Sequence, residues 1–154
     1  AGEEKDPNQA QYTAAGYASR MEQAESTLAP LDQTISGMNW ASFEGQVKLP
    51  AAAQSATMQS YMQAARNFIN AVLRRESGAV ISPSEFAEAR QQYLPQPGDA
   101  PDVLAQKKAN RHLVFTTLRR AAGQAYEPPL GTAGTAPPAP ATNPFRRRPN
   151  ATSR

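Results

Sequence analysis

The chain of 154 residues contains no cysteine, so it lacks the disulfide framework that holds small secreted scaffolds together. Aromatic residues make up only 7% of it and its mean hydropathy is −0.61, which predicts a thin core or one that partner subunits complete. No apolar run approaches the length of a membrane-spanning helix, so we expect no membrane span.

Acidic and basic residues are unevenly distributed along the chain, whose net charge is +3. Residues 1–50 carry three basic and seven acidic groups, whereas residues 51–154 carry thirteen and six. Such a division indicates head-to-tail contacts between copies, nucleic acid near the basic part, or simply a solvated surface. Because the chain opens at Ala1 with polar residues that no apolar stretch follows, we interpret it as a processed product or a fragment.

Residues 1–50 are expected to form an N-terminal helix followed by an aromatic loop. The helix begins after Asn8, and its apolar and small residues recur at alternating spacings of three and four, as in a coiled-coil seam. These residues are Ala14, Tyr17, Met21, Ala24, Leu28, Leu31 and Ile35. Because proline removes an intrahelical donor, Pro30 predicts a kink or an end near Leu28, with a turn or loop from Asp32 onward.

The stretch between Gly37 and Pro50 shows no sustained hydrophobic period. We expect a loop in which Trp40 and Phe43 either anchor a partner protein or cover the local core. We also expect the N-terminal helix to reach out to neighbouring molecules.

Residues 51–123 are expected to form a helical core. A helix over residues 52–76 presents a broad apolar face and ends at Gly78, which can adopt the left-handed conformation. A short helix begins at Pro83, because Ser82 and Glu85 have the spacing of a capping box, and a stiff proline-containing turn ends it.

The last predicted helix runs over residues 101–122, with Asp99 or Asp102 serving its amino end and Gly123 as its stop. The three core helices are expected to pack through Phe68, Val72, Leu73, Phe86, Tyr93, Leu104, Phe115 and Leu118. Basic residues on the polar side of the last helix are expected to form ion pairs, to dock on an acidic protein surface or to contact DNA. They are Lys107, Lys108, Arg111, Arg119 and Arg120.

Residues 124–154 contain seven of the fourteen prolines and almost no large apolar side chains. They cannot bury enough surface to offset the entropy of ordering, so we expect an extended tail that orders only against a partner. The residues expected to anchor this tail to a partner protein or to DNA are Phe145, Arg146, Arg147 and Arg148.

Signals for catalysis and metal binding are sparse. Glu76 and Ser77 are similar to the Glu-Ser dipeptide that carries the catalytic acid of lytic transglycosylases, but the glycine-rich run that shapes that family's groove is absent. His112 is the single histidine, so a metal site would need scattered carboxylates as ligands. We therefore expect no enzyme, no metal and no cofactor, with a peptidoglycan-cleaving enzyme that uses Glu76 as an alternative.

Three consecutive motifs give a more specific resemblance. They are residues 67–79 (NFINAVLRRESGA), 81–86 (ISPSEF) and 92–99 (QYLPQPGD). In this order and spacing, residues 64–123 resemble the internal virion proteins of tailed bacteriophages, which are also called DNA-transfer or ejection proteins and sometimes tail tape-measure proteins. The chain departs from the family pattern at Leu94, where an aromatic residue is usual, and at Ala100, where a serine cap is typical.

The predicted elements indicate an all-α protein in which three to four amphipathic helices form a small bundle or helical hairpins, with an extended proline-rich tail. The resemblance implies a structural virion protein, inside the capsid or at the portal and tail vertex, that assists genome delivery. It implies several copies, docking on portal or tail-tube proteins and other ejection proteins, and contact with genomic DNA and the host cell envelope. A tail tape-measure or tail-adaptor segment is the alternative that the same resemblance allows.

Overall fold

The computed structural model describes residues 5–78 and 80–129, without the side chains of residues 76 and 77. Within these ranges the chain forms five α-helices, two short 3-10 helices and no strand. The elements are α1 (Gln9–Ser36), α2 (Trp40–Lys48), η1 (Ala51–Ala53), α3 (Ala56–Ser77), α4 (Pro83–Tyr93), α5 (Pro101–Ala122) and η2 (Gly123–Ala125). The all-α prediction is confirmed, with more helices in the described ranges than the three to four expected.

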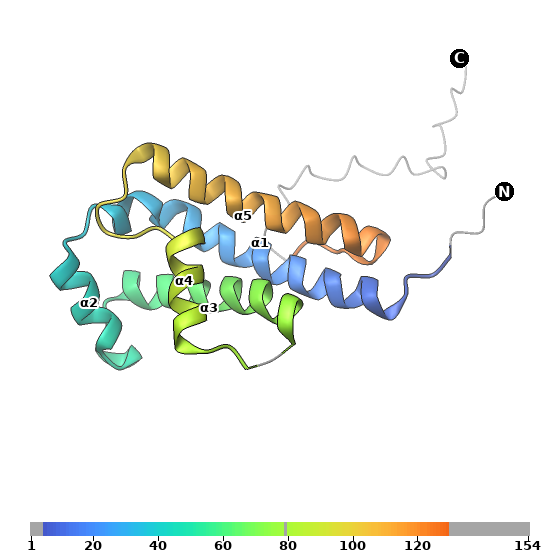
Figure 1. Ribbon diagram of the computed structural model, residues 1–154, viewed down its shortest axis with the longest axis horizontal. Helices are drawn as coiled ribbons and strands as arrows, with labels where there is room; N and C mark the ends of the chain where they lie inside the picture. The colour runs from blue at the N-terminus through green and yellow to red at the C-terminus, as the bar shows by residue number, and fades with distance from the viewer. Residues whose placement is uncertain (1–4, 79, 130–154) are drawn as a thin grey trace, which may run out of the picture.

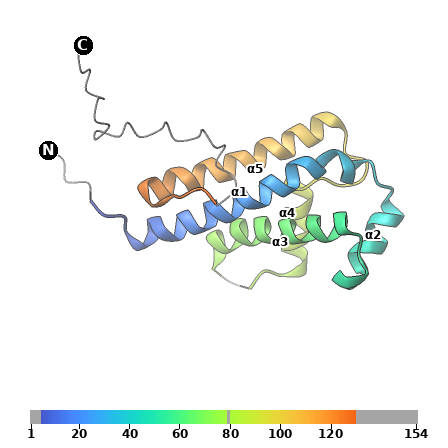
Figure 2. The same cartoon turned by 180° about the vertical axis from the view of Figure 1, so that it is seen from behind.

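Helix α1 is the centre of the bundle. It lies between α3 and α5, while α4 crosses α3 and also contacts α5, and α2 lies at one end (Figure 1; Figure 2 shows the reverse side). Small side chains on its buried face allow two helices to approach it closely. Its buried residues are Ala15, Ala18, Met21, Ala24, Leu28, Asp32 and Ile35. The expectation that the N-terminal helix reaches away from the bundle is therefore wrong.

Helix α1 continues through Pro30, so the boundary expected near Leu28 and the loop expected from Asp32 are wrong. Proline removes one intrahelical hydrogen bond, here the bond to the carbonyl of Ser26. Pro30 and Ser26 are both exposed, so water can bond that carbonyl. Elsewhere around the helix Leu28 and Ile35 are fully buried, and this packing outweighs the lost hydrogen bond.

The segment expected to be an aromatic loop contains helix α2. The side chain of Asn39 caps this helix by accepting a hydrogen bond from the backbone N of Ser42 at 2.7 Å. Phe43 is fully buried, with its ring centroid 5.8 Å from that of Tyr61, whereas Trp40 is 49% exposed. Phe43 therefore belongs to the core and is not a surface anchor, and of the two aromatic residues Trp40 faces solvent.

Helices α3 and α4 form close to where the sequence places them. Helix α3 begins at Ala56 rather than near residue 52, because Ser55 caps it, and it ends at Gly78, whose φ is 62°. The predicted capping box opens α4, since Ser82 Oγ accepts from Glu85 N at 3.2 Å and Glu85 Oε2 accepts from Ser82 N at 2.8 Å. The hydrogen bond from the Ser82 backbone, with a smaller effect of its hydroxyl, lowers the pKa of Glu85.

Helix α5 has the predicted bounds, and Asp102 lies in its first turn, where a negative charge favours the amino end, although neither aspartate caps it by a hydrogen bond. The residue at its amino end is Ala100, which offers no side-chain bond, and Asp99 bonds to other groups. Four of the expected core residues are buried, namely Phe68, Val72, Leu104 and Leu118. The other four are partly buried against the core, namely Leu73, Phe86, Tyr93 and Phe115.

Candidate functional site

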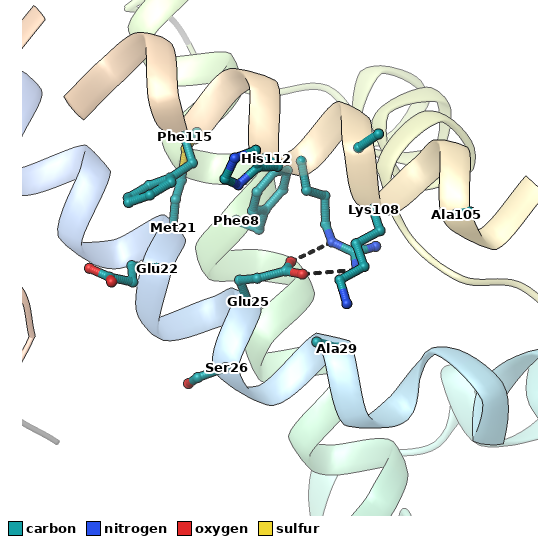
Figure 3. A pocket seen from close by; sticks show the side chains of 12 residues that line it. Met21, Glu22, Glu25, Ser26, Ala29, Phe68, Ala105, Lys108, His112 and Phe115 are labelled. Carbon is teal, nitrogen blue, oxygen red and sulfur yellow. Dashed lines mark hydrogen bonds and ion pairs between the residues drawn. The ribbon is translucent and has the colours of Figure 1, made fainter. Parts of the chain in front are cut away.

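A groove of about 820 Å³ lies between α1 and α5, with Phe68 of α3 at its back (Figure 3). Its volume lies in the range of pockets that bind small molecules or peptide side chains. The wall on α1 consists of Met21, Glu22, Glu25, Ser26 and Ala29. The wall on α5 consists of Ala105, Lys108, Ala109, Arg111, His112 and Phe115.

The helical repeat explains why this groove forms. On α1, the residues Met21, Glu25 and Ala29 recur every four positions and so face the same side of the helix. On α5, Ala105 and Ala109 have the same spacing. Because alanine side chains are short, they leave open the space between the two helices that larger side chains would fill.

A buried arginine joins the two walls of the groove. Arg111 is 1% exposed, and its guanidinium donates to both carboxylate oxygens of Asp32, at 2.9 and 3.2 Å, and to the carbonyl of Tyr93 at 2.9 Å. It also donates from Nε and Nη2 to Glu25, as the dashed lines of Figure 3 show. Burial opposes the charge, but the hydrogen bonds and charges of Glu25 and Asp32 outweigh it and raise the pKa of Arg111.

The geometry of this network suits arginine in particular. Glu25 and Asp32 lie seven residues apart on α1, which is two helical turns, so both carboxylates reach the same guanidinium. A planar guanidinium has five N–H donors, enough for two carboxylates and a carbonyl. Through these bonds Arg111 connects α5 with the centre of α1 and with the last residue of α4.

A second buried ion pair holds the turn between α4 and α5. Lys107 Nζ lies 2.6 Å from Asp99 Oδ2, which also accepts a hydrogen bond from the backbone N of Gln96 at 2.9 Å. The hydroxyl of Tyr61 donates to the carbonyl of Pro95 at 2.9 Å. Because burial disfavours the ionised phenolate, it raises the pKa of Tyr61 well above the ordinary value. The turn is therefore anchored from both α3 and α5.

After α5 the chain folds back on the bundle as the return segment, which we define as residues 123–129. The ring of Tyr126 lies edge-on to Phe115, with centroids 6.1 Å apart, and the guanidinium of Arg119 lies 5.4 Å from its centroid. The hydroxyl of Tyr126 donates to the carboxylate of Glu22. The first residues of the expected extended tail therefore pack on α1 and α5, because Tyr126 has partners on both helices.

The basic residues predicted on α5 divide into two groups. Lys107 and Arg111 are buried and paired with carboxylates, so they do not lie on the surface that was expected to meet DNA or an acidic protein. Their spacing of four places both on the inner side of the helix. Lys108, Arg119 and Arg120 are exposed, and Lys108 borders the groove.

Other predicted residues are placed differently. Phe145, Arg146, Arg147 and Arg148 lie outside the described residues, and so does the side chain of Glu76. His112 is exposed on the groove wall, with its ring centroid 6.4 Å from that of Phe115. Among the described side chains, no three metal-ligating residues form a cluster. None of the helices between residues 5 and 129 has the length and apolar character needed to cross a membrane.

The sequence motifs do not identify Glu25 and Asp32 as site residues. A signal for them exists, because both lie close to the apolar seam of α1, where an acidic side chain needs a buried cation as its partner. That partner, Arg111, lies 86 residues after Glu25 in the sequence, and no local pattern links the two.

Comparisons with protein-family models, curated proteins and solved structures found no match for this chain. Its function must therefore be inferred from the groove, its charged residues and the sequence motifs.

Proposed function

We propose that the chain is a structural, non-catalytic assembly protein of a tailed-phage virion, an ejection-type internal protein present in several copies. In this role it docks on portal or tail-tube proteins and on other ejection proteins, inside the capsid or at the portal and tail vertex. It assists genome delivery, with contacts to DNA and to the host cell envelope during infection. Supporting this, the motifs that resemble the phage proteins fall in α3, α4 and the turns around α4.

The observation that favours a binding role over a catalytic one is that carboxylates around the groove are engaged in hydrogen bonds within the chain. Glu25 and Asp32 accept hydrogen bonds from Arg111, and Glu22 accepts one from Tyr126. These three carboxylates thereby join separate parts of the chain. A general acid or base must instead face its substrate and exchange a proton with it. The groove therefore suits the binding of peptide side chains better than it suits a reaction.

Exposed residues supply the contacts that assembly requires. Trp40 is 49% exposed at one end of the bundle, and large aromatic side chains are frequent anchors at protein interfaces. Lys108, Arg119 and Arg120 are the described residues of α5 that we assign to DNA or to an acidic protein surface. The tail residues that we assign to partner anchoring are Phe145, Arg146, Arg147 and Arg148.

Cryo-electron microscopy of the particle that contains this chain tests the proposal. We expect ordered copies beneath the portal or along the tail tube, related by the symmetry of that vertex. Copies confined to the distal tip of the tail would instead support the tape-measure or tail-adaptor alternative, and absence from the particle would overturn the proposal. Cell-wall lysis by the purified chain that Glu76→Gln abolishes would support the transglycosylase alternative.

A further inference from the structure

We propose that the groove between α1 and α5 is the docking site of the chain that directly follows Pro129, with Leu130 as its anchoring side chain. The occupant is the same molecule's residues 130–133, Leu-Gly-Thr-Ala. This proposal goes beyond the proposed function and does not depend on a role in a virion.

The path of the return segment is the first reason. The segment begins beside Gln11, whose side chain lies against Gly123, and it reaches Ser19, whose hydroxyl donates to the carbonyl of Glu127 at 2.9 Å. The chain thus advances along α1 in the direction of Met21, where the groove begins. Figure 2 shows the segment turning back from the end of α5 and running beside α1.

The return segment already touches the groove. Tyr126 contacts Phe115 on one wall and Glu22 on the other, and both of these residues line the groove. Pro129 follows three residues later and is partly buried. Residue 130 is one peptide unit further, a step of about 3.8 Å between Cα atoms. Residue 130 therefore follows closely on a segment that already contacts the groove.

The chemistry of the next residues matches the groove. Leu130 is the only aliphatic side chain larger than alanine or proline in residues 130–154. The end of the groove nearest the return segment offers Met21, Phe68 and Phe115 as apolar partners for it. Burying such a side chain there removes apolar surface from water on both sides of the contact.

The length of the groove also matches this segment. From Met21 to Ala29 the wall on α1 spans eight residues, a rise of about 12 Å at 1.5 Å per residue. About four residues of extended chain, at roughly 3.3 Å each, cover that distance. The three residues after Leu130 have small side chains, which fit between the alanines that form the far end of the walls, Ala29, Ala105 and Ala109.

The arginine cluster of the tail is a poorer occupant of this groove. Phe145 lies fifteen residues beyond Leu130 and is followed directly by three arginines. The groove wall already carries Lys108 and Arg111, and Glu25 is paired with Arg111. With Glu22 included, the formal charges that line the groove cancel, so the groove offers an arginine cluster no net attraction to offset its loss of hydration. The uncharged residues after Pro129 do not carry that cost.

The single histidine makes a direct test available in the full chain. His112 lines the groove, so an occupant should shield its ring from diethyl pyrocarbonate, whose attachment to this one residue mass spectrometry can follow over time. We expect Leu130→Ser to speed modification of His112 about tenfold, since it removes the apolar anchor. The matched control, Phe145→Ser, changes the other large apolar residue of the tail and should leave the rate unchanged.

A second pair of variants separates docking from a general effect on the fold. Ala109 is exposed and lines the groove, so the larger side chain of Ala109→Trp should fill the groove. In that background, His112 should be modified at the same rate with and without Leu130→Ser. Gln106 is exposed on the same helix but does not line the groove. With Gln106→Trp, the tenfold effect of Leu130→Ser should persist.

Two results would overturn the proposal. Equal rates for the unchanged chain and for Leu130→Ser would show that Leu130 does not shield His112. Slower modification of the Leu130→Ser variant on mixing it with the unchanged chain would show that another copy donates the segment. Neither result depends on locating the protein in a particle, so this proposal and the proposed function can fail separately.

Discussion

Arg111 is the side chain at which three helices meet. Its partners are Glu25 and Asp32 on α1 and the last residue of α4, Tyr93. A buried ion pair of this kind adds little net stability relative to apolar packing, because both charges lose their hydration. Its importance lies in the cost of breaking it, since a single substitution leaves the opposite charges buried without a partner.

Replacing Arg111 should therefore be among the most damaging single changes in the bundle. We expect Arg111→Met to lower the free energy of unfolding by about 3 to 5 kcal/mol, because the buried carboxylate of Asp32 would lose its cation. Urea denaturation of both proteins measures this difference. Lys108→Met, three residues earlier and exposed, should change the value by less than about 0.5 kcal/mol. Equal stabilities of the two variants would refute the role given to Arg111.

The contribution of Tyr61 to the free energy of unfolding should depend on pH. We expect Tyr61→Phe to cost about 1 kcal/mol at neutral pH, because the buried carbonyl of Pro95 loses its donor. The raised pKa of Tyr61 means that the folded chain keeps the phenol proton above pH 10, where the unfolded chain loses it. This part of the stability is complete below pH 10 and declines as the pH rises further.

The difference in unfolding free energy between the unchanged chain and Tyr61→Phe should consequently shrink above pH 10. Urea titrations at several alkaline pH values measure it, and the other tyrosines affect both proteins alike. A difference that stays constant between pH 8 and pH 11 would mean that Tyr61 ionises as easily in the fold as in the unfolded chain.

At the scale of elements, local signals were sufficient where a helix end is defined by its own residues. The capping box of Ser82 and Glu85 and the left-handed Gly78 depend on neighbours in sequence, and both elements end where the pattern predicts. The errors concern α1 and α2, whose conformation is decided by distant contacts. In α1, Pro30 disfavours a helix locally, but the burial of flanking residues against α3 and α5 outweighs that cost. In α2, the contact of Phe43 with Tyr61 of α3 favours a helix where the local sequence suggests a loop.

The proline within α1 gives a prediction for this element. Pro30→Ala restores an N–H that can bond the carbonyl of Ser26, and Pro30 is exposed, so no core packing is lost. We expect the variant to be more stable by about 1 to 3 kcal/mol, the range bounded by the cost of proline inside a helix. Thermal unfolding followed by circular dichroism measures the gain. A lower melting temperature would indicate that Pro30 stabilises the chain by restricting its unfolded state.

At the scale of the whole molecule, the division into residues 1–50 and 51–123 does not describe the packing. Helix α1 supplies the surface on which α3 and α5 pack, so the two parts share one core. The candidate site follows the same rule, because one wall of the groove comes from each part. The sequence allowed the all-α class and most helix ends to be predicted, but not this groove, whose walls lie about 80 residues apart in the chain.

The proposed anchoring of the tail is tested on the assembled particle. We expect simultaneous replacement of Arg146, Arg147 and Arg148 by alanine to lower the number of copies per particle at least about tenfold, which corresponds to the loss of one strong interfacial contact. Quantitative mass spectrometry of purified particles measures the copy number. Arg66→Ala removes an exposed arginine from α3 and serves as the control. Normal incorporation of the triple variant would show that these arginines do not anchor the protein in the particle.

The central position of α1 also has a consequence for the way the protein is made. Asp32 is synthesised 79 residues before its partner Arg111, a delay of about 4 to 16 s at roughly 5 to 20 residues per second. During that time the apolar seam of α1 has no α5 to cover it, although α3 can pack on it earlier. The nascent chain thus presents an uncovered hydrophobic surface, and we expect chaperones that act near the ribosome exit to bind it.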